Sequence, residues 1–234
     1  MDVFERVRAD LLDLGACVTT PYGLRRVTYA DHIASGRHLR SVEKALSEAV
    51  LPLYANTHTE DSALGAHTTR LTHEAAEYVK RCLGAGPEYK LLFPGTGATG
   101  ALKRLQEILG VSVSPQHRER LLSVLPERER VVVFVGPYEH HSNDVTWRES
   151  LAEVVPVPLD DDGLIDLAAL ERAVSDPRYA ERPKVGSFSA ASNVTGLVTD
   201  VRAVARILHR HGAVAVFDFA ASAPYVRIDV GPTS

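Results

Sequence analysis

Lysine is scarce in this sequence of 234 residues. Of its 26 lysine and arginine residues only five are lysines, and the formal net charge is −4. Acidic and basic residues are mixed along the chain, so no basic stripe faces a nucleic-acid backbone and we expect no nucleic-acid partner. The cysteines Cys17 and Cys82 form no CxxC pair, which argues against a disulfide framework and a cysteine metal site. Any role that requires a lysine therefore has few candidates.

Long apolar runs are also missing. The longest, Val131–Val135 and Val214–Phe217, are far shorter than the ~20 residues of a membrane-spanning helix. The first residues, Met-Asp-Val-Phe-Glu-Arg, do not resemble a signal peptide. A hydrophobic fraction of 45% with 24% charged residues is typical of a globular protein. We therefore expect a cytoplasmic protein with a sizeable core and no membrane partner.

The first sixty residues differ from the rest. Apolar spacing predicts a helix over Asp2–Leu14 and another from Ser41 to about Leu53, with a polar, turn-rich stretch between them. The segment Asn56–Thr72 is rich in hydroxyls and histidines and shows no periodicity until a helix predicted over Thr72–Leu83, so we expect a loop there. Residues 1–60 are expected to form an N-terminal helical and extended arm, and residues 61–234 a large domain.

From Tyr89 onward, short apolar runs alternate with amphipathic helices. Continuous apolar strands separated by helices are typical of an α/β fold with a mostly parallel sheet covered on both faces. Ligands of such sheets bind beyond the carboxyl ends of the strands, so the loops that leave the strands are the candidate sites. The predicted strands are Lys90–Phe93, Val131–Val135, Val154–Val157, Lys184–Ser189 and Val214–Phe217, and the predicted helices are Ala98–Leu109, Leu167–Val174 and Val201–His211.

The first of these loops, Pro94–Gly100, is rich in glycine. Glycines let the backbone approach an anion, the following helix favours a phosphate at its start, and Thr99 adds a hydroxyl donor. Gly95, Gly97 and Gly100 also match the dinucleotide fingerprint, so an NAD(P) oxidoreductase is an alternative. That fingerprint requires an acid at the end of the next strand, and Glu139 comes much too late.

Two further loops contain planar side chains. His140 and His141 follow the strand Val131–Val135, but no carboxylate or cysteine at ligand spacing completes a zinc site. A flat imidazole in this place is suited to stacking on a planar ring. Asn193, after the strand Lys184–Ser189, offers both a donor and acceptors.

The last loop begins with Asp218, directly after an apolar strand. A carboxylate there is costly to bury unless it meets a cation, such as a protonated pyridine nitrogen. A phosphate cradle, an imidazole, an amide and a carboxylate at strand ends together describe one planar, phosphorylated, nitrogen-containing ligand, and pyridoxal 5′-phosphate (PLP) fits that description. The alternatives without a ligand are purely structural: a glycine-rich turn, histidines hydrogen-bonded to the backbone and an aspartate that caps the next turn.

Five motifs in this order resemble the class V aminotransferases, a family that includes the cysteine desulfurases and kynureninase-like enzymes. The resemblance runs from about residue 28 to the end of the sequence. It implies a large domain of the PLP-dependent transferase, aspartate-aminotransferase-like fold, a homodimer with shared active sites, PLP as cofactor and an amino acid as substrate. The motifs are Tyr29-Ala30-Asp31-His32, Gly97-Ala98-Thr99, Glu139-His140-His141-Ser142-Asn143, Ser192-Asn193-Val194-Thr195-Gly196 and Asp218-Phe219-Ala220-Ala221.

The resemblance also implies roles for single residues. A carboxylate paired with the pyridine nitrogen keeps the ring protonated, so that the ring can act as an electron sink. On the substrate side, Asn56, His58 and Arg70 are candidates. The implied cofactor contacts are Gly97, Ala98 and Thr99 at the phosphate, His140 stacked on the pyridine ring, Asn193 at the ring oxygen and Asp218 at the pyridine nitrogen.

Two positions depart from the family pattern. Ala221 stands where many desulfurases have a glutamine, and the family's Schiff-base lysine, in a Ser-x-His-Lys context beyond the aspartate, is not reached before Ser234. The lysines of this chain fall in predicted helices or at strand starts, away from the ligand, so we expect no catalytic residue among them. They are Lys44, Lys80, Lys90, Lys103 and Lys184.

We therefore interpret the chain as the amino-terminal part of a longer PLP-dependent enzyme, an aminotransferase or a cysteine desulfurase-like protein, without its small C-terminal domain. As an isolated chain it is expected to be inactive. A non-catalytic, truncated module of the same fold is the alternative, and the NAD(P)-binding oxidoreductase is less favoured.

Overall fold

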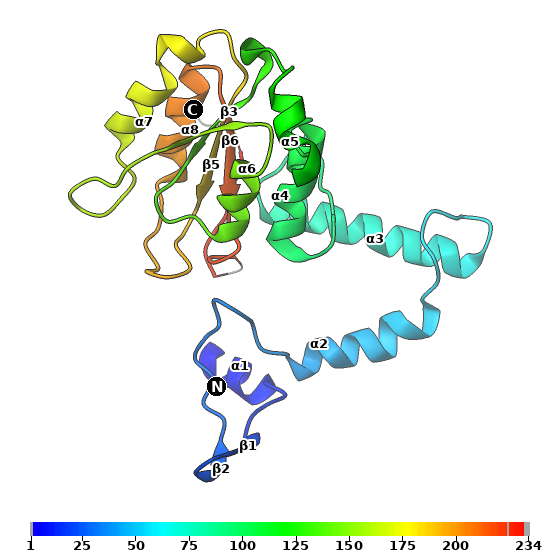
Figure 1. Cartoon of the computed structure of the whole chain (residues 1–234). Coiled ribbons are helices and arrows are strands. Elements are labelled where there is room, and N and C mark those ends of the chain that lie inside the picture. The colour runs from blue at the N-terminus through cyan, green and yellow to red at the C-terminus, as the bar shows by residue number, and fades with distance from the viewer. Residues whose placement is uncertain (1, 224, 232–234) are drawn as a thin grey trace. The chain divides into compact units, whose positions relative to one another are not determined.

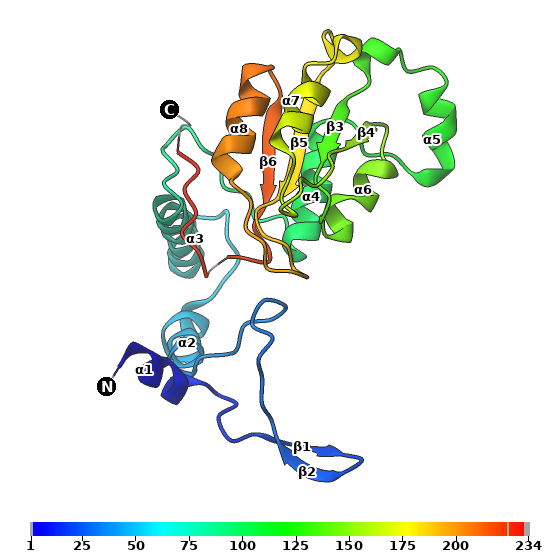
Figure 2. The same cartoon turned by 90° about the vertical axis from the view of Figure 1, so that its left-hand side faces the viewer.

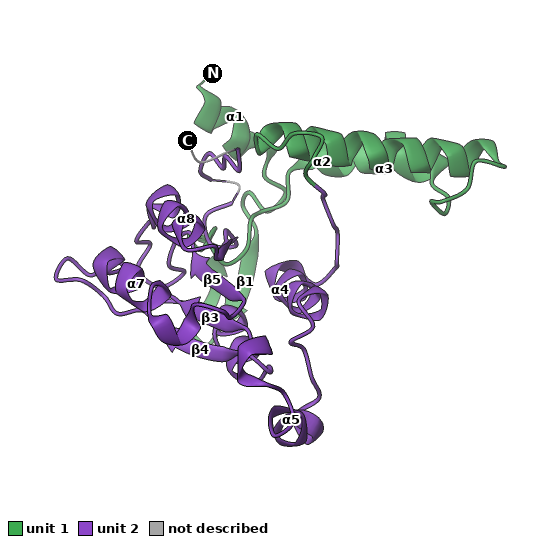
Figure 3. Ribbon diagram, turned by 90° about the horizontal axis from the view of Figure 1, so that it is seen from above, with its two compact units in different colours: residues 1–89 green, residues 90–234 purple. Residues whose placement is uncertain are grey.

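The computed structural model describes residues 2–223 and 225–231. It divides into two compact units, residues 1–89 and 90–234, shown in green and purple in Figure 3. The domain boundary predicted at residue 60 stays a prediction, and the last residues of the predicted large domain, 232–234, lie outside the described residues.

The first unit is built from helices and one hairpin. It comprises α1 (Val3–Asp10), the antiparallel strands β1 (Cys17–Thr20) and β2 (Gly23–Arg26), α2 (Arg40–Ala45) with a π-helical turn (Leu46–Val50) and a 3₁₀ turn (Leu51–Leu53), and α3 (Ala63–Cys82). The helix predicted to begin at Ser41 is confirmed in position, although its second half is not α-helical. The hairpin falls in the stretch where the sequence indicated only turns.

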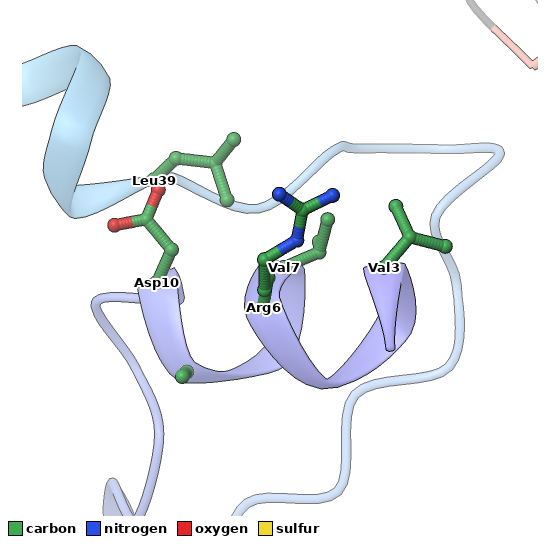
Figure 4. Close-up of a pocket in the computed structure, with 6 residues that line it drawn as sticks. Val3, Arg6, Val7, Asp10 and Leu39 are labelled. Atoms are coloured by element: carbon green, nitrogen blue, oxygen red, sulfur yellow. The ribbon is translucent and has the colours of Figure 1, made fainter. Parts of the chain in front are cut away.

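The helix predicted over Asp2–Leu14 is confirmed but shorter. Asp2 and Glu5 form a capping box at its start, and it ends at Asp10 because Leu11 is extended and forms a bridge with Leu39. Figure 4 shows a hollow along α1 that is lined by Val3, Arg6, Val7 and Asp10, with Leu39 next to Asp10.

α3 begins at Ala63, so the expectation of a loop up to Thr72 is wrong for its second half. Ser62 caps the helix by accepting a hydrogen bond from the Gly65 N–H at 3.0 Å. The buried face of its first turns consists of Gly65, Thr68 and Thr69. Because this face carries small and hydroxyl side chains, an apolar period cannot reveal it.

The second unit is a parallel four-stranded sheet with helices on both faces (Figures 1 and 2), which confirms the predicted α/β class. The strand order is β4-β3-β5-β6. The strands are β3 (Val132–Val135), β4 (Glu153–Pro156), β5 (Lys184–Ser189) and β6 (Val214–Asp218), and the helices are α4 (Gly97–Ile108), α5 (Pro115–Leu122), α6 (Val145–Arg148), α7 (Leu167–Val174) and α8 (Val201–Arg210), with short 3₁₀ turns at Glu127–Glu129, His141–Asn143 and Pro177–Tyr179.

The alternation of β3 divides the core in two. Val132 and Phe134 pack with Leu170 of α7 and Leu208 of α8 on one face of the sheet. On the other face Val133 and Val135 pack with Trp147 of α6, with Leu105 of α4 and with Leu109 directly after it. Each large side chain buried in this way contributes about 1.5–3 kcal/mol. β3 is therefore packed on both faces up to Val135, close to the start of the loop that contains His140.

The strand predicted over Lys90–Phe93 is wrong. Within the described residues this segment pairs with no strand, and Leu92 and Phe93 are 60% and 66% exposed. A strand requires hydrogen bonds to a neighbour, which β-rich composition alone does not supply. α5 and the hairpin, in turn, form where no element was predicted.

No helix in the described ranges 2–223 and 225–231 has both the length and the apolar character that a membrane crossing needs.

Candidate functional site

The glycine-rich loop has a strained backbone. Gly95, Thr96 and Gly97 all have positive φ values, of 77°, 41° and 64°. A non-glycine residue rarely adopts this conformation, and such strain gathers at ligand sites. A side chain at Gly100 would lie 2.3 Å from the Thr96 hydroxyl and 2.5 Å from the Gly95 carbonyl, so only glycine fits there. The loop is therefore wound tightly onto the start of α4.

α4 begins with Gly97, Ala98 and Thr99, and no side chain caps it. Its first amide groups are donors without an intrahelical partner, and the helix dipole adds positive potential there. Ala98 is half-buried, whereas Thr99 is exposed. An uncapped helix start that follows left-handed residues is a suitable binding place for a phosphate.

This helix start lies at the carboxyl edge of the sheet. The opposite end of α4 is fixed at the amino edge, because the carbonyl of Val111 accepts a hydrogen bond from the N–H of Leu151, just before β4 (2.9 Å). α4 also packs against the turn His141–Asn143, which follows β3. Its helix axis therefore runs opposite to the strands, as the parallel fold requires.

His140 precedes that turn and is held by its neighbour. The ring atom Nδ1 accepts a hydrogen bond from the Ser142 N–H at 3.2 Å and lies 2.8 Å from the Ser142 hydroxyl. The ring is exposed, and an Nδ1 that accepts a bond from an N–H leaves the proton on Nε2. His141 is also exposed, with its ring centroid 6.0 Å from that of His140. His140 therefore presents a fixed, exposed imidazole at this edge.

Asp218 ends β6, and its Oδ1 atom accepts a hydrogen bond from the Ala220 N–H at 2.8 Å. Within the described part of the chain, its Oδ2 atom accepts none. The Asp218 carbonyl accepts a bond from the Ala190 N–H, and Ser189 is its partner in the sheet register. Asp218 thus offers a half-buried carboxylate beside the end of β5.

Asn193 lies in the turn that leaves β5. The buried Ser192 hydroxyl accepts bonds from the N–H groups of Val194 and Thr195, both at 3.2 Å, and so shapes this turn. The Asn193 side chain is exposed and, among the described residues, forms no hydrogen bond with His140 or Asp218. The turn shares their edge, but the amide is not brought to the carboxylate.

Glu139 is the residue that sequence reasoning missed. Its Oε1 accepts a bond from the Ser189 N–H at 2.8 Å, and its Oε2 accepts bonds from the Ser189 hydroxyl and the Asn143 amide, both at 2.6 Å. Burial raises the pKa of its carboxyl; these bonds oppose the rise, and the charge of Asp218 adds to it. Glu139 stands in a motif that was interpreted through its histidines, and nothing in the local sequence indicates that its carboxylate is partly buried.

The substrate-side candidates lie in the first unit. Asn56 and His58 are exposed, and His58 has a φ of 68° while its N–H donates to the Thr69 hydroxyl at 3.2 Å. Arg70 is exposed on α3. These residues remain candidates on a separate unit from the cofactor candidates.

Two lysines of the second unit point away from the candidate site. Lys103 donates to the Ser112 hydroxyl, beyond the end of α4, and Lys184 donates to the carbonyls of Tyr179 and Ala180 at the amino end of β5. In the described part of the molecule, no group of three or more histidine, cysteine, aspartate or glutamate side chains could hold a metal ion.

The residues at the carboxyl edge fit PLP in kind. Backbone donors and Thr99 suit its phosphate, Asp218 suits the protonated ring nitrogen, and His140 suits the ring face. The dinucleotide alternative is weakened, because no strand leads directly into Gly95 in the described residues 83–94.

The comparisons with known proteins agree on one family. A family model described as Aminotransferase class-V matches residues 28–233. A probable cysteine desulfurase from Halalkalibacterium halodurans is 29% identical over 208 residues, which cover 87% of this chain and 47% of the relative. A probable cysteine desulfurase from Streptomyces coelicolor is 28% identical over 209 residues, or 88% of this chain and 46% of the relative. The chain thus spans about half the length of these curated relatives.

Solved structures share the fold. The apo structure of a cysteine desulfurase from Thermococcus onnurineus superposes with a TM-score of 0.74 at 21% identity, covering 98% of this chain and 50% of that one. The cysteine desulfurase CsdA from Escherichia coli gives a TM-score of 0.68 at 23% identity, covering 98% of this chain and 52% of that one. The predicted PLP-dependent transferase fold is thereby confirmed. On the strength of the family match, the chain belongs to the class V aminotransferases, a family of PLP-dependent enzymes.

Proposed function

We propose that this chain forms the cofactor site of a PLP-dependent enzyme that acts on an amino acid, as an aminotransferase or a cysteine desulfurase-like protein. One observation carries the proposal. The uncapped start of α4, wound by three left-handed residues, lies at the same edge of the sheet as the carboxylate of Asp218. A phosphate donor set and an anion for a ring nitrogen are the two ends of a PLP site.

Each candidate has a distinct part. The amides of Ala98 and Thr99 and the Thr99 hydroxyl bind the phosphate, with Gly97 giving the backbone its close approach. Asp218 orients the ring and keeps its nitrogen protonated, and His140 covers one ring face and excludes water from it. Asn193 reaches the ring oxygen once its exposed amide turns inward. The bound cofactor supplies an electron sink for charge at the substrate α-carbon.

The substrate class follows from the relatives. Several are named cysteine desulfurases, which makes L-cysteine the first substrate to test. Ala221 in place of the glutamine of many desulfurases keeps amino-group transfer open. Asn56, His58 and Arg70 are proposed for the substrate side. A cytoplasmic homodimer, with residues 1–60 as an arm and 61–234 as the large domain, completes the proposal.

Heat protection tests the cofactor. A ligand that binds only the folded chain stabilises it by RT ln(1 + [L]/Kd), about 2.7 kcal/mol at a hundredfold excess over Kd. We expect PLP to raise the midpoint of thermal unfolding by several degrees, with pyridoxal much less effective because it lacks the phosphate. Protection by NAD(P) and none by PLP would overturn the proposal.

A second candidate is a PLP-binding module without covalent chemistry of its own. The positions of Lys103 and Lys184 favour it, because both ammonium groups have partners away from the carboxyl edge. Borohydride reduction followed by peptide mass mapping separates the two candidates. A module binds PLP reversibly and gains no stoichiometric label, whereas a single labelled lysine in the chain would contradict it.

A further inference from the structure

A half-buried carboxylate, that of Glu139, lies near the carboxyl edge of the sheet without a cation. Glu139 accepts three hydrogen bonds, two from Ser189 and one from Asn143, all between 2.6 and 2.8 Å. Among the described residues, no lysine, arginine or histidine forms an ion pair with it. Removing a carboxylate from water costs free energy, and here only neutral donors offset that cost.

The partners of Glu139 connect it to the core. The Asn143 carbonyl oxygen accepts bonds from the indole N–H of Trp147 at 3.1 Å and from the Ser187 hydroxyl at 2.5 Å. Asn143, Trp147 and Ser187 are all fully buried. The side chain of Glu139 is therefore fixed by a network whose other members cannot move without opening the core.

The same carboxylate also joins the loops that bear the cofactor candidates. Glu139 is the direct neighbour of His140 in the chain, and through Ser189 it is bound to the end of β5, where Asp218 lies alongside in the sheet register. The Ser189 carbonyl in turn accepts a bond from Thr199, at the end of the turn that contains Asn193. One side chain thus connects the segments that hold His140, Asn193 and Asp218.

We propose that Glu139 is a positioning residue of the cofactor site, which fixes the loop of His140 against the strand end beside Asp218. This inference rests on the proposed function, because it assigns Glu139 to the PLP site. A ligand that bridges His140 and Asp218 binds tightly only when both loops are already in place. Loss of the hydrogen bonds between Glu139, Ser189 and Asn143 is therefore expected to weaken PLP binding while the chain still folds.

The geometry suggests a selective variant. Glu139→Gln keeps the shape of the side chain but turns one acceptor into an N–H₂ group. With its oxygen on the Ser189 N–H, that group faces the Asn143 amide, so two donors meet. Asn143 cannot flip without losing its bonds to Trp147 and Ser187. The double variant Glu139→Gln/Asn143→Asp reverses donor and acceptor and restores the pairing and the charge.

The experiment titrates PLP into the wild type, the single variant, the double variant and the control Glu149→Gln, an exposed residue in the next turn. Trp147 is the one tryptophan of the sequence and reports binding by fluorescence quenching. We expect Glu139→Gln to raise the dissociation constant about tenfold, the double variant to return it to within about threefold, and the control to leave it unchanged. The ¹⁵N shifts of the His140 ring should move in Glu139→Gln and return in the double variant.

The outcomes separate the two proposals. Equal PLP affinity and unchanged His140 shifts in Glu139→Gln would overturn the positioning role and leave the proposed function intact. A wild type that does not bind PLP would overturn the proposed function and, with it, this role. If Glu139→Gln does not fold, Ser189→Ala removes one bond without touching the charge, and the role then requires about threefold weaker binding. An unchanged dissociation constant in Ser189→Ala would contradict it.

Discussion

The two edges of the sheet treat a glutamate in opposite ways. At the amino edge, Glu153 accepts a 2.7 Å bond from Arg182, whose side chain is 4% exposed, and a 3.2 Å bond from the Tyr179 hydroxyl. Near the carboxyl edge, Glu139 meets only neutral donors. Burial raises the pKa of both carboxyls, but at Glu153 the bond and charge of Arg182 outweigh it, so the pKa of Glu153 is lowered and that of Glu139 is raised.

The two glutamates illustrate two roles: Glu153 stabilises the fold, whereas Glu139 lies beside the candidate ligand site. The carboxylate of Glu153 has its own cation in Arg182, so this pair stabilises the fold and needs no ligand to balance its charge. At the carboxyl edge, the carboxylate of Glu139 has no cation and the start of α4 has no side-chain cap. Only one carboxylate oxygen of Asp218 accepts a hydrogen bond within the described residues. Sites with this kind of imbalance are candidates for binding a ligand that supplies the missing charges.

The largest effect is expected from breaking the amino-edge pair. Arg182→Ala leaves the Glu153 carboxylate without its cation and should cost about 3 kcal/mol of unfolding free energy in urea. PLP affinity, extrapolated to the folded fraction, should stay unchanged. The matched control Arg178→Ala removes an exposed pair with Asp176 and should cost at most about 1 kcal/mol. A loss of PLP affinity in Arg182→Ala as large as that at the carboxyl edge would remove the distinction between the two edges.

Asp218→Asn should give the next largest effect, on binding instead of stability. The neutral amide no longer favours a protonated ring nitrogen, so PLP should bind about 10- to 100-fold more weakly, a loss of roughly 1.4–2.8 kcal/mol. The unfolding free energy should change by less than about 1 kcal/mol, because the amide oxygen of asparagine can still accept the hydrogen bond from the Ala220 N–H. Asp161→Asn, in an exposed turn, serves as the control in the same fluorescence titration. Equal effects of the two substitutions would argue against Asp218 as a ring contact.

Gly100→Ala tests the tight glycine-rich loop that leads into α4. The new methyl group would lie within 2.3 Å of the Thr96 hydroxyl, so the loop must open, at a cost of about 1–3 kcal/mol. Thermal unfolding and inorganic phosphate binding should both weaken, whereas Ala101→Ser, at an exposed position one residue on, should change neither. A variant that unfolds earlier but binds phosphate as before would place the phosphate elsewhere.

The smallest effect is a dependence on pH of opposite sign at the two edges. The raised pKa of Glu139 stabilises the fold fully below the ordinary value of 4.5, and this contribution is lost as pH rises through the folded-state pKa. The lowered pKa of Glu153 stabilises the fold above 4.5, and its contribution is lost as pH falls through the folded-state pKa. Urea unfolding between about pH 2 and pH 8 checks this, because the contribution of Glu153 is lost only below about pH 4.5. Relative to the wild type, Glu139→Gln should gain stability as pH rises, and Glu153→Gln should lose its deficit as pH falls.

The sequence predicted most of the sheet, because its strands contain short apolar runs and the two central strands, β3 and β5, are buried on both faces. β5 and α7 lie within the predicted residues, and β3, β4 and β6 are displaced by a residue at most at either end. The misses have physical reasons. Lys90–Phe93 has the composition of a strand but no neighbouring strand to pair with among the described residues. The first turns of α3 were not predicted because their buried face consists of Gly65, Thr68 and Thr69, which give no apolar period.

The candidate site was predictable as a set of loops but not as a network. Strand ends identify where Thr99, His140 and Asp218 lie, since parallel strands share one carboxyl edge. The hydrogen bonds between Glu139, Asn143 and Ser189 join residues up to 50 positions apart, and a local sequence pattern cannot predict such long-range bonds. The exposed amide of Asn193 likewise follows from the shape of its turn and not from its sequence.

Hydrogen–deuterium exchange with and without PLP locates the bound cofactor on the chain. If PLP binds at the carboxyl edge, exchange should become slower at residues 95–100, 137–143 and 218–223 and should not change at residues 176–184 of the amino edge. Protection that is confined to the amino edge, or absent from all three carboxyl-edge segments while PLP is bound, would contradict binding at the carboxyl edge.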